Sequence, residues 1–244
     1  FVIWDREKKK LFGARDIFGI KPFYYAKMNG CLLFGSEIKS FLEHPKFDKV
    51  LNEEALGNYL SFQFVPSNET FFKGVYCLQP GHYFTYENGE MEITRYFEPN
   101  FTGDTDKSFE EIVDEVEKTM VESVEAHKIS DVEVGSYLSS GVDSSYMAYL
   151  GQVDRTFTVG FGEERYSEIR DAKEFAKSIH MENDSKIIEP DEYWDSLSDA
   201  MYYMDEPVAD PAAIALYFLS REAAKKVKVV LSGEGSDELF GGYN

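Results

Sequence analysis

Two short loops, Ser139–Ser145 and Ser232–Glu238, carry residues suited to binding a nucleotide and a metal ion. Each loop is rich in serine and glycine, so its backbone N–H groups can approach a ligand closely. Each loop also carries an aspartate, Asp143 in the first and Asp237 in the second. Carboxylates are preferred ligands of Mg²⁺, and phosphate oxygens commonly complete its coordination shell. The two loops together predict a site for a nucleoside triphosphate with Mg²⁺.

The elements around these loops support that interpretation. Short apolar strands are predicted before them, at Val134–Leu138 and Val227–Leu231. A helix predicted at Ser144–Gln152 follows the first loop, and the N-terminus of a helix favours an anion. Open α/β sheets bind ligands beyond the carboxyl ends of their strands, which is where both loops fall. The chain has no Walker A sequence, and either loop alone could be an ordinary strand-to-helix turn.

The pattern of strands and helices in the second half of the chain, residues 108–244, predicts an α/β domain. Its first helix is expected to begin at Ser108, where Glu111 completes a capping box. Strands and helices then alternate, which is typical of a parallel, doubly wound sheet. Besides the elements already named, we expect strands at 156–161 and 184–188 and helices at 168–181, 191–204 and 212–226. No helix is expected after the second loop.

The first part of the chain, residues 1–98, is β-rich. Two hairpin turns are predicted, at Asn29-Gly30 and at Asn88-Gly89, because Asn-Gly is a strong hairpin signal. Such hairpins build antiparallel sheets, and one helix is expected at Glu53–Phe62. The expected strands are 1–5, 10–15, 22–27, 31–35, 82–87 and 92–97. Residues 99–107 are polar and turn-rich, which suits a linker.

Composition restricts the class of protein. Of the 244 residues, 43% are hydrophobic and 16% aromatic, which suits a packed core rather than disorder. The net charge of −20 argues against a large nucleic-acid-binding surface. No apolar stretch reaches the ~20 residues of a membrane helix. Cys31 and Cys77 form no CxxC pair, which suits a reducing cytoplasm without disulfides or structural zinc. The chain begins with Phe1 and stops soon after the second loop, so we expect a fragment cut within a domain at both ends.

Four stretches resemble one known family. Leu138–Ser145 resembles the pyrophosphate loop of ATP pyrophosphatases, and Leu231–Tyr243 resembles the second signature of glutamine-dependent asparagine synthetases. Arg15–Tyr25 and Ser36–Phe41 resemble the late part of that family's glutaminase domain. The chain is therefore identified as a member of that family along nearly its whole length.

The resemblance implies a fold for each part. Residues 1–98 are implied to be part of an α+β N-terminal-nucleophile hydrolase domain, the glutamine amidotransferase type. Residues 108–244 are implied to form an α/β doubly wound parallel sheet of the ATP pyrophosphatase type, also described as adenine nucleotide alpha hydrolase-like.

The resemblance also implies a reaction. Aspartate would attack the α-phosphate of ATP to give β-aspartyl-AMP and pyrophosphate, and ammonia from glutamine would then displace AMP to give asparagine. The implied ligands are ATP, Mg²⁺, aspartate and glutamine, in the cytoplasm, without nucleic acid or membrane. A homodimer is the candidate assembly.

Particular residues take roles by the same resemblance. The candidate catalytic residues are Asp143, Asp237 and Glu234: the two aspartates would bind Mg²⁺, and the glutamate would organise the adenylate intermediate. Asp16 would pair with the α-amino group of glutamine; the alternative is a turn residue that caps Ile17-Phe18-Gly19. The residues implied to bind ATP are Leu138, Ser139, Gly141, Asp143, Ser144, Ser145, Val159, Ser232 and Gly233. For Leu138 and Val159 the alternative is a plain core position in a strand.

Three features depart from the family pattern. The N-terminal cysteine nucleophile is absent, and Cys31 and Cys77 are interpreted as structural, so this polypeptide is not expected to hydrolyse glutamine. Ser140 stands where the commoner loop has glycine, and we expect a turn that accepts serine. A lysine that would close over pyrophosphate is not identified.

Alternatives stay open at this point. A sister amidotransferase on the same scaffold would activate another carboxylate, on a cell-wall precursor, on a peptide or for lactam formation. A non-catalytic nucleotide-binding paralogue is the alternative of another class. The acid–proline pairs Asp205-Glu206-Pro207 and Asp210-Pro211 fit either a plain helix start or a loop that faces substrate.

Overall fold

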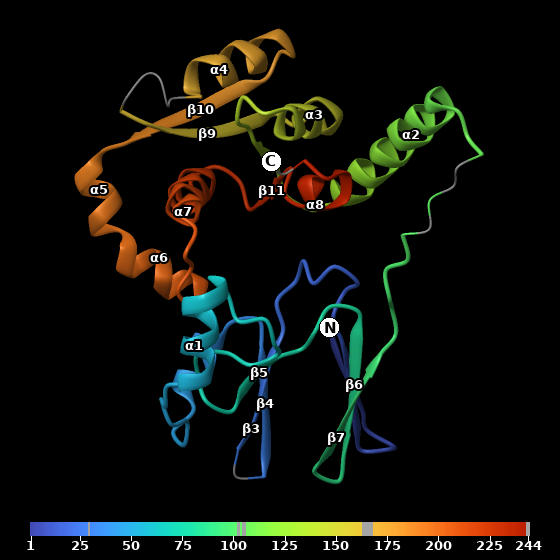
Figure 1. Ribbon diagram of the computed structural model, residues 1–244, viewed down its shortest axis with the longest axis vertical. Helices are drawn as coiled ribbons and strands as arrows, with labels where there is room; N and C mark the ends of the chain where they lie inside the picture. The colour runs from blue at the N-terminus through green and yellow to red at the C-terminus, as the bar shows by residue number, and fades with distance from the viewer. Residues whose placement is uncertain (29, 102, 104–105, 163–167, 243–244) are drawn as a thin grey trace. The chain divides into compact units, whose positions relative to one another are not determined.

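The chain forms two compact units (Figure 1). The computed structural model describes residues 1–28, 30–101, 103, 106–162 and 168–242. Unit 1 contains Phe1–Gly103 together with Met201–Asp210, and unit 2 contains Asp104–Ala200 together with Pro211–Asn244. Met201–Asp210 thus belongs to unit 1 although the chain on both sides of it belongs to unit 2. Chain order alone does not indicate this arrangement.

Unit 1 is built on two antiparallel sheets. The first has the order β1-β2-β6-β7, with bounds Val2–Asp5, Lys10–Ala14, His82–Glu87 and Glu90–Arg95. The second has the order β4-β3-β5, with bounds Cys31–Gly35, Tyr24–Met28 and Val75–Cys77. The 3-10 helix η1 (Ile38–Glu43) and the helix α1 (Glu53–Phe62) complete the unit. One core cluster joins both sheets and consists of Phe23, Tyr25, Leu78 and Phe84.

The turn between β6 and β7 forms as the Asn-Gly signal predicts. Asn88 and Gly89 both have positive φ, 53° and 85°, and Glu87 pairs with Glu90 across the turn. Both central residues of a tight hairpin need this conformation, which asparagine and glycine tolerate. Asn29 of the other predicted turn lies outside the described residues. The strand β5 and the helix η1 were not predicted, because three and six residues are too short for a periodic pattern.

Unit 2 contains a parallel sheet with the strand order β10-β9-β8-β11. In chain order its strands are β8 (Val134–Tyr137), β9 (Arg155–Phe161), β10 (Glu182–Ile188) and β11 (Val229–Leu231). The strand order therefore extends from β8 through β9 to β10, and then reverses to place β11 on the other side of β8. In open α/β sheets such a switch point opens a crevice that binds ligands.

Helices cover both faces of this sheet (Figure 1). On one face α3 (Val142–Gly151) and α4 (Ile169–Ser178) pack around Leu138. On the other face α7 (Ala212–Ala223) packs against Phe157. The remaining long helix, α2 (Phe109–His127), contacts α3. Strands and helices alternate as the sequence predicts, and the sheet is doubly wound.

The capping box at the start of α2 is present as predicted: the Glu111 N–H donates to Ser108 Oγ, and the Ser108 N–H donates to the Glu111 carboxylate. Two other predictions were wrong. The helix expected at 191–204 is two helices, α5 (Pro190–Asp195) and α6 (Leu197–Met204), separated by Ser196. Ser196 Oγ donates back to the Tyr193 carbonyl, a bond that bends helices.

The second wrong prediction concerns the end of the second loop, where no helix was expected. A short helix, α8 (Ser236–Phe240), begins inside that loop, and its five residues are too few for periodicity to reveal it. Within the described part of the chain, none of the helices has the length and apolar character needed to cross a membrane.

Candidate functional site

The two Ser/Gly-rich loops begin at neighbouring strand ends of unit 2. The first follows β8 and the second follows β11, and these strands are parallel, with Leu231 in register with Ser136. Both loops therefore leave the sheet at the same edge, at the switch point of the strand order. The topology places the predicted ligand residues where such sheets bind ligands.

A close backbone contact joins the two loops. A Cβ atom at Gly233 would lie 3.1 Å from the Ser144 nitrogen and 3.2 Å from the Cβ of Asp143. These distances are shorter than ordinary van der Waals contact, so glycine alone fits here without displacing a neighbour. The second loop therefore lies directly against the start of α3.

The first loop is organised by its own serines. The Ser139 N–H donates to Ser144 Oγ at 3.0 Å, and the two hydroxyl oxygens lie 2.7 Å apart. The Gly141 N–H donates to Ser139 Oγ at 3.0 Å. Gly141 is the N-cap of α3, and the helix start makes no side-chain capping bond. The first N–H groups of the helix are thus available to an anion, and the dipole of the ten-residue helix favours one.

Ser140 fits this loop without strain. It is exposed, and it is not among the described non-glycine residues with positive φ. The expectation of a turn that accepts serine is therefore confirmed.

The acidic residues of the two loops lie at or near helix starts. Asp143 is exposed in the first turn of α3, and Asp237 is half-buried in the first turn of α8. Asp237 is held in a tight turn, because its carbonyl accepts the N–H groups of Gly241 and Gly242. A Cβ atom at Gly242 would collide with the Asp237 carboxylate.

Glu234 is exposed, and its N–H donates to Ser232 Oγ at 3.3 Å. Over the described residues, no group of three or more His, Cys, Asp or Glu side chains could hold a metal ion by itself. Two carboxylates suit a Mg²⁺ ion whose remaining ligands are phosphate oxygens and water.

Leu138 and Val159 lie in the sheet beside the first loop. The Leu138 side chain is 2% exposed and packs against Ala148, Ala172 and Ala176. Its N–H donates to the Phe157 carbonyl, and its carbonyl accepts a bond from Thr158 Oγ1. Val159 is half-buried in β9. The contacts of Leu138 are those of a core residue, and the role of both residues at adenosine stays a prediction.

Asp16 organises the loop that follows it. Its carboxylate accepts the N–H groups of Phe18 at 3.2 Å, Ile20 at 2.9 Å and Lys21 at 3.0 Å. Burial works to raise the pKa of Asp16, but the backbone N–H groups outweigh it and lower the pKa below its usual value. The carboxylate is thus ionised and engaged by its own loop, and its pairing with glutamine stays a prediction.

Arg15 is a residue that sequence reasoning missed. Its guanidinium donates to the carbonyls of Gly19, Lys21 and Leu78 at 2.7–3.0 Å and lies 3.0 Å from Cys77 Sγ. In the turn that leads to β3, Arg15 therefore binds the Gly19 and Lys21 carbonyls, and Asp16 binds the N–H groups given above. Arg15 opens the stretch Arg15–Tyr25 that resembles the glutaminase domain, but that resemblance gave it no role of its own.

The acid–proline pair at Asp205 and Glu206 was left between two interpretations. Asp205 accepts the N–H groups of Ile38 at 2.8 Å and Lys39 at 3.0 Å, and Glu206 accepts the Phe71 N–H at 2.7 Å. All five residues belong to unit 1. These side chains therefore hold protein backbone rather than a ligand.

Cys31 and Cys77 are both free thiols.

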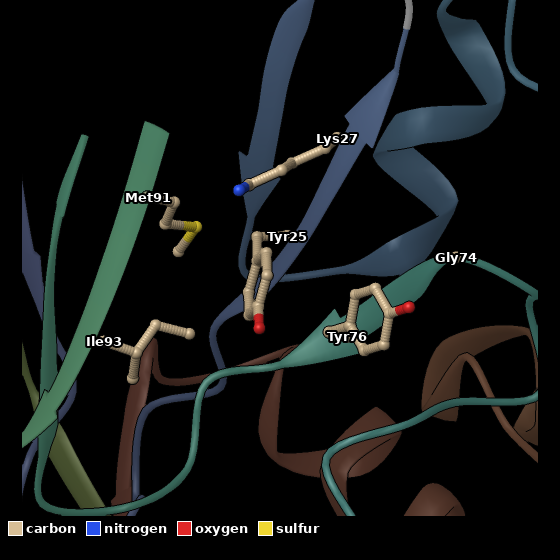
Figure 2. Close-up of a pocket in the computed structure, with 6 residues that line it drawn as sticks. All are labelled: Tyr25, Lys27, Gly74, Tyr76, Met91 and Ile93. Carbon is tan, nitrogen blue, oxygen red and sulfur yellow. The ribbon is translucent and has the colours of Figure 1, made fainter. Parts of the chain in front are cut away.

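Unit 1 also contains a cavity of about 360 Å³ (Figure 2). Tyr25 and Lys27 of β3 and Tyr76 beside Gly74 line one side, and Met91 and Ile93 of β7 line the other. None of the predicted site residues lines this cavity.

Comparisons with known proteins identify the family of the chain. The family described as asparagine synthase matches residues 115–244, and the glutamine amidotransferase domain matches residues 1–97. Asparagine synthetase [glutamine-hydrolyzing] 1 of Bacillus subtilis is 44% identical over the whole chain, and asparagine synthetase [glutamine-hydrolyzing] 3 of the same organism is 30% identical over the whole chain. The chain spans 39% and 43% of the length of these two relatives.

Among solved structures, the NMN synthetase of Francisella tularensis overlaps 54% of this chain and 58% of its own, at 17% identity and a TM-score of 0.39. A score this low supports no argument about the site. The family match covers more than half of the chain, and the two loops at the switch point fall within it. The chain therefore belongs to the asparagine synthase family.

Proposed function

We propose that the whole protein makes asparagine from aspartate with ATP and with ammonia derived from glutamine. The observation that carries this proposal is the contact of Gly233 with Asp143 and Ser144 at the switch point, because it unites the two family signatures in one site. The matches to the asparagine synthase family and to the glutamine amidotransferase domain support assigning unit 2 to the ATP pyrophosphatase type and unit 1 to the N-terminal-nucleophile hydrolase type. The proposed domains are residues 1–98 and 108–244, joined by the linker 99–107.

The first step activates a carboxylate. A side-chain oxygen of aspartate attacks the α-phosphorus of ATP, the bond to pyrophosphate breaks, and β-aspartyl-AMP forms. Negative charge develops on the leaving pyrophosphate, so donors fixed before the reaction stabilise the transition state. Ser139, Gly141, Ser144 and Ser145 are the proposed donors at the N-terminus of α3. The bonds between Ser139 and Ser144 hold this loop in place before ATP binds.

Asp143 and Asp237 are the proposed metal ligands. Asp143 lies in the first loop and Asp237 in the second, and Mg²⁺ is usually bound by one or two carboxylates plus phosphates. When bound, Mg²⁺ would neutralise charge on the triphosphate. The shape of the Asp237 turn, which depends on Gly241 and Gly242, would hold one of these carboxylates in position.

The second step forms the amide. Ammonia attacks the acyl carbon of β-aspartyl-AMP, AMP departs with the oxygen that came from aspartate, and the nitrogen loses a proton. Glu234 is the proposed residue that organises the adenylate, since it is exposed in the second loop beside Ser232. Leu138, Val159, Ser232 and Gly233 are proposed to line the adenosine site. Asp16 is proposed to recognise glutamine, either directly or by shaping the loop that it holds.

Isotope transfer in the whole protein tests this mechanism. Aspartate labelled with heavy oxygen in its side-chain carboxylate is incubated with ATP, Mg²⁺ and ammonia, and the products are analysed by mass spectrometry. We expect one labelled oxygen in AMP, because the carboxylate oxygen stays on the α-phosphorus. Label in inorganic phosphate, or product formation without pyrophosphate release, would contradict the adenylate. Amide formation on another carboxylate but not on aspartate would contradict the assigned substrate.

A further inference from the structure

The segment Met201–Asp210 has an unusual place in the structure. It contains the last turn of α6 and the acid–proline pair Asp205-Glu206-Pro207, and it belongs to unit 1. The boundary between the units falls within α6, so one helix continues from Ala200 of unit 2 into this segment. Pro211, which directly follows the segment, belongs to unit 2 again. The segment is therefore covalently continuous with unit 2 at both of its ends.

Asp205 caps a helix that is more than 160 residues away in the sequence. The N-cap residue of η1, Glu37, makes no side-chain capping bond, and the first turn of η1 has no acidic residue. Both carboxylate oxygens of Asp205 instead accept the Ile38 and Lys39 N–H groups that a local cap would satisfy. A carboxylate at a helix start supplies both the acceptors and the favourable charge.

The same carboxylate is paired with Lys39. The Lys39 ammonium lies 3.0 Å from Asp205 Oδ1, and the side chains are 14% and 6% exposed. The ammonium also lies 3.3 Å from Glu37, donates to the Tyr203 carbonyl at 3.4 Å and lies 5.5 Å from the ring centre of Tyr202. Lys39 thus contacts three residues of the segment, which gives Asp205 a specific and largely desolvated position.

The backbone at Asp205 is strained. Its φ is +64°, in the left-handed region that non-glycine residues seldom occupy. Such a conformation persists when surrounding contacts impose it, and it is concentrated at functional positions. The neighbouring Glu206 accepts the Phe71 N–H from a half-buried position. Two consecutive acids thus bind two separate parts of unit 1.

Connectivity relates this anchor to the nucleotide edge of unit 2. β10 ends at Ile188 on the edge that carries both loops, and α5 and α6 lead from there to the segment. After the segment, α7 packs along β9 and β10 and leads to the start of β11 at the opposite edge. The N-terminus of α7 therefore lies at the same edge as the loops.

We propose that Asp205 is a positioning residue that couples glutamine hydrolysis to amide formation. It accepts hydrogen bonds from the Ile38 and Lys39 N–H groups, and Glu206 accepts one from the Phe71 N–H. Together these bonds fix the segment Met201–Asp210 in unit 1. The inference rests on the proposed function, because it concerns the use of ammonia by the synthetase site. Release of the segment would loosen the two connections to the nucleotide edge without touching either set of reacting groups.

The test compares two substitutions in the whole protein. Asp205→Asn keeps a residue that tolerates positive φ and keeps one acceptor, whereas Asp205→Gly keeps the backbone freedom and loses both acceptors. Asp195→Asn is the matched control, because Asp195 is an exposed acid at the end of α5. Amide hydrogen exchange is measured over residues 37–43 and 201–210. Glutamate and asparagine are quantified in the same reaction.

We expect the Ile38 and Lys39 amides to exchange about fivefold faster in the Gly variant than in the wild type, because loss of a helix cap costs about 1 kcal/mol. The increase should be smaller in the Asn variant, which keeps one acceptor. The ratio of glutamate to asparagine formed should rise about twofold to tenfold, and more in the Gly variant than in the Asn variant. Synthesis from added ammonia and glutamine hydrolysis should both persist in the two variants. The control should match the wild type in every measurement.

Two outcomes would overturn the inference: unchanged exchange at Ile38 and Lys39, or faster exchange with an unchanged product ratio. If the wild-type protein makes no asparagine from glutamine, the proposed function fails instead. In that case exchange over residues 201–210 decides whether Asp205 fixes the segment.

Discussion

Replacing Gly233 with alanine tests whether the two loops form one site. The added Cβ would lie 3.1 Å from the Ser144 nitrogen and 3.2 Å from both the carbonyl carbon and the Cβ of Asp143. Ordinary contact begins at 3.4 Å, so the loops must separate by about 0.3 Å, and two of the three atoms are rigid backbone. Gly233 does not have positive φ, so the effect comes from this contact and not from backbone strain.

The expected loss follows from geometry. Displacement of reacting groups by about 1 Å costs up to about 10²-fold in rate, so a shift of a few tenths of an ångström predicts a loss of about threefold to thirtyfold. Overpacking of a tight contact commonly costs about 1–3 kcal/mol of stability. We therefore expect slower aspartate-dependent pyrophosphate release and a modestly lower melting temperature, with glutamine hydrolysis retained in the whole protein.

The matched control is Gly57→Ala. Gly57 lies in the interior of α1, exposed, and a Cβ there meets nothing within 4 Å. Alanine should stabilise the helix by about 0.5–1 kcal/mol and leave pyrophosphate release unchanged. If Gly233→Ala retains wild-type pyrophosphate release at an unchanged melting temperature, the loops do not meet as described, and the reasoning is refuted.

Three further predictions concern single side chains. Glu234→Gln should slow aspartate-dependent pyrophosphate release by about 10²–10³-fold while sparing glutamine hydrolysis, and an equal loss of both activities would indicate misfolding instead. Ser108→Ala should lower the free energy of unfolding by about 1 kcal/mol in denaturant titrations, because it removes the capping box of α2; an unchanged midpoint would show that the cap contributes nothing. Burial, opposed by the Phe71 N–H and reinforced by the charge of Asp205, raises the pKa of Glu206, so the folded state binds its proton more tightly than the unfolded state does. Its contribution to stability is then present at pH below the ordinary pKa of 4.5 and is lost as pH rises through the raised folded value. The melting temperature of Glu206→Gln should therefore rise relative to that of the wild type as the pH increases above 4.5, and a difference that stays constant with pH would contradict this.

Local signals in the sequence determined much of the fold. The capping box at Ser108 and the turn at Asn88-Gly89 depend on residues next to one another, so their energies are local and are visible without the tertiary structure. The alternation of apolar strands and amphipathic helices likewise determined the parallel sheet of unit 2. The Ser/Gly-rich loops were located by composition and by resemblance, since each is a contiguous stretch.

Contacts between distant residues could be decided only by the tertiary structure. The approach of Gly233 to Asp143 depends on β11 lying beside β8, and this strand order is not encoded in either loop. The capping of η1 by Asp205 joins residues 166 and 167 positions apart, and Glu206 reaches Phe71 across 135. The motif left Asp16 as either a glutamine ligand or a turn cap, and only the structure shows that its carboxylate binds the N–H groups of its own loop. A motif specifies which side chains are present, but the partners of an aspartate depend on which N–H groups the folded backbone brings within about 3 Å of it.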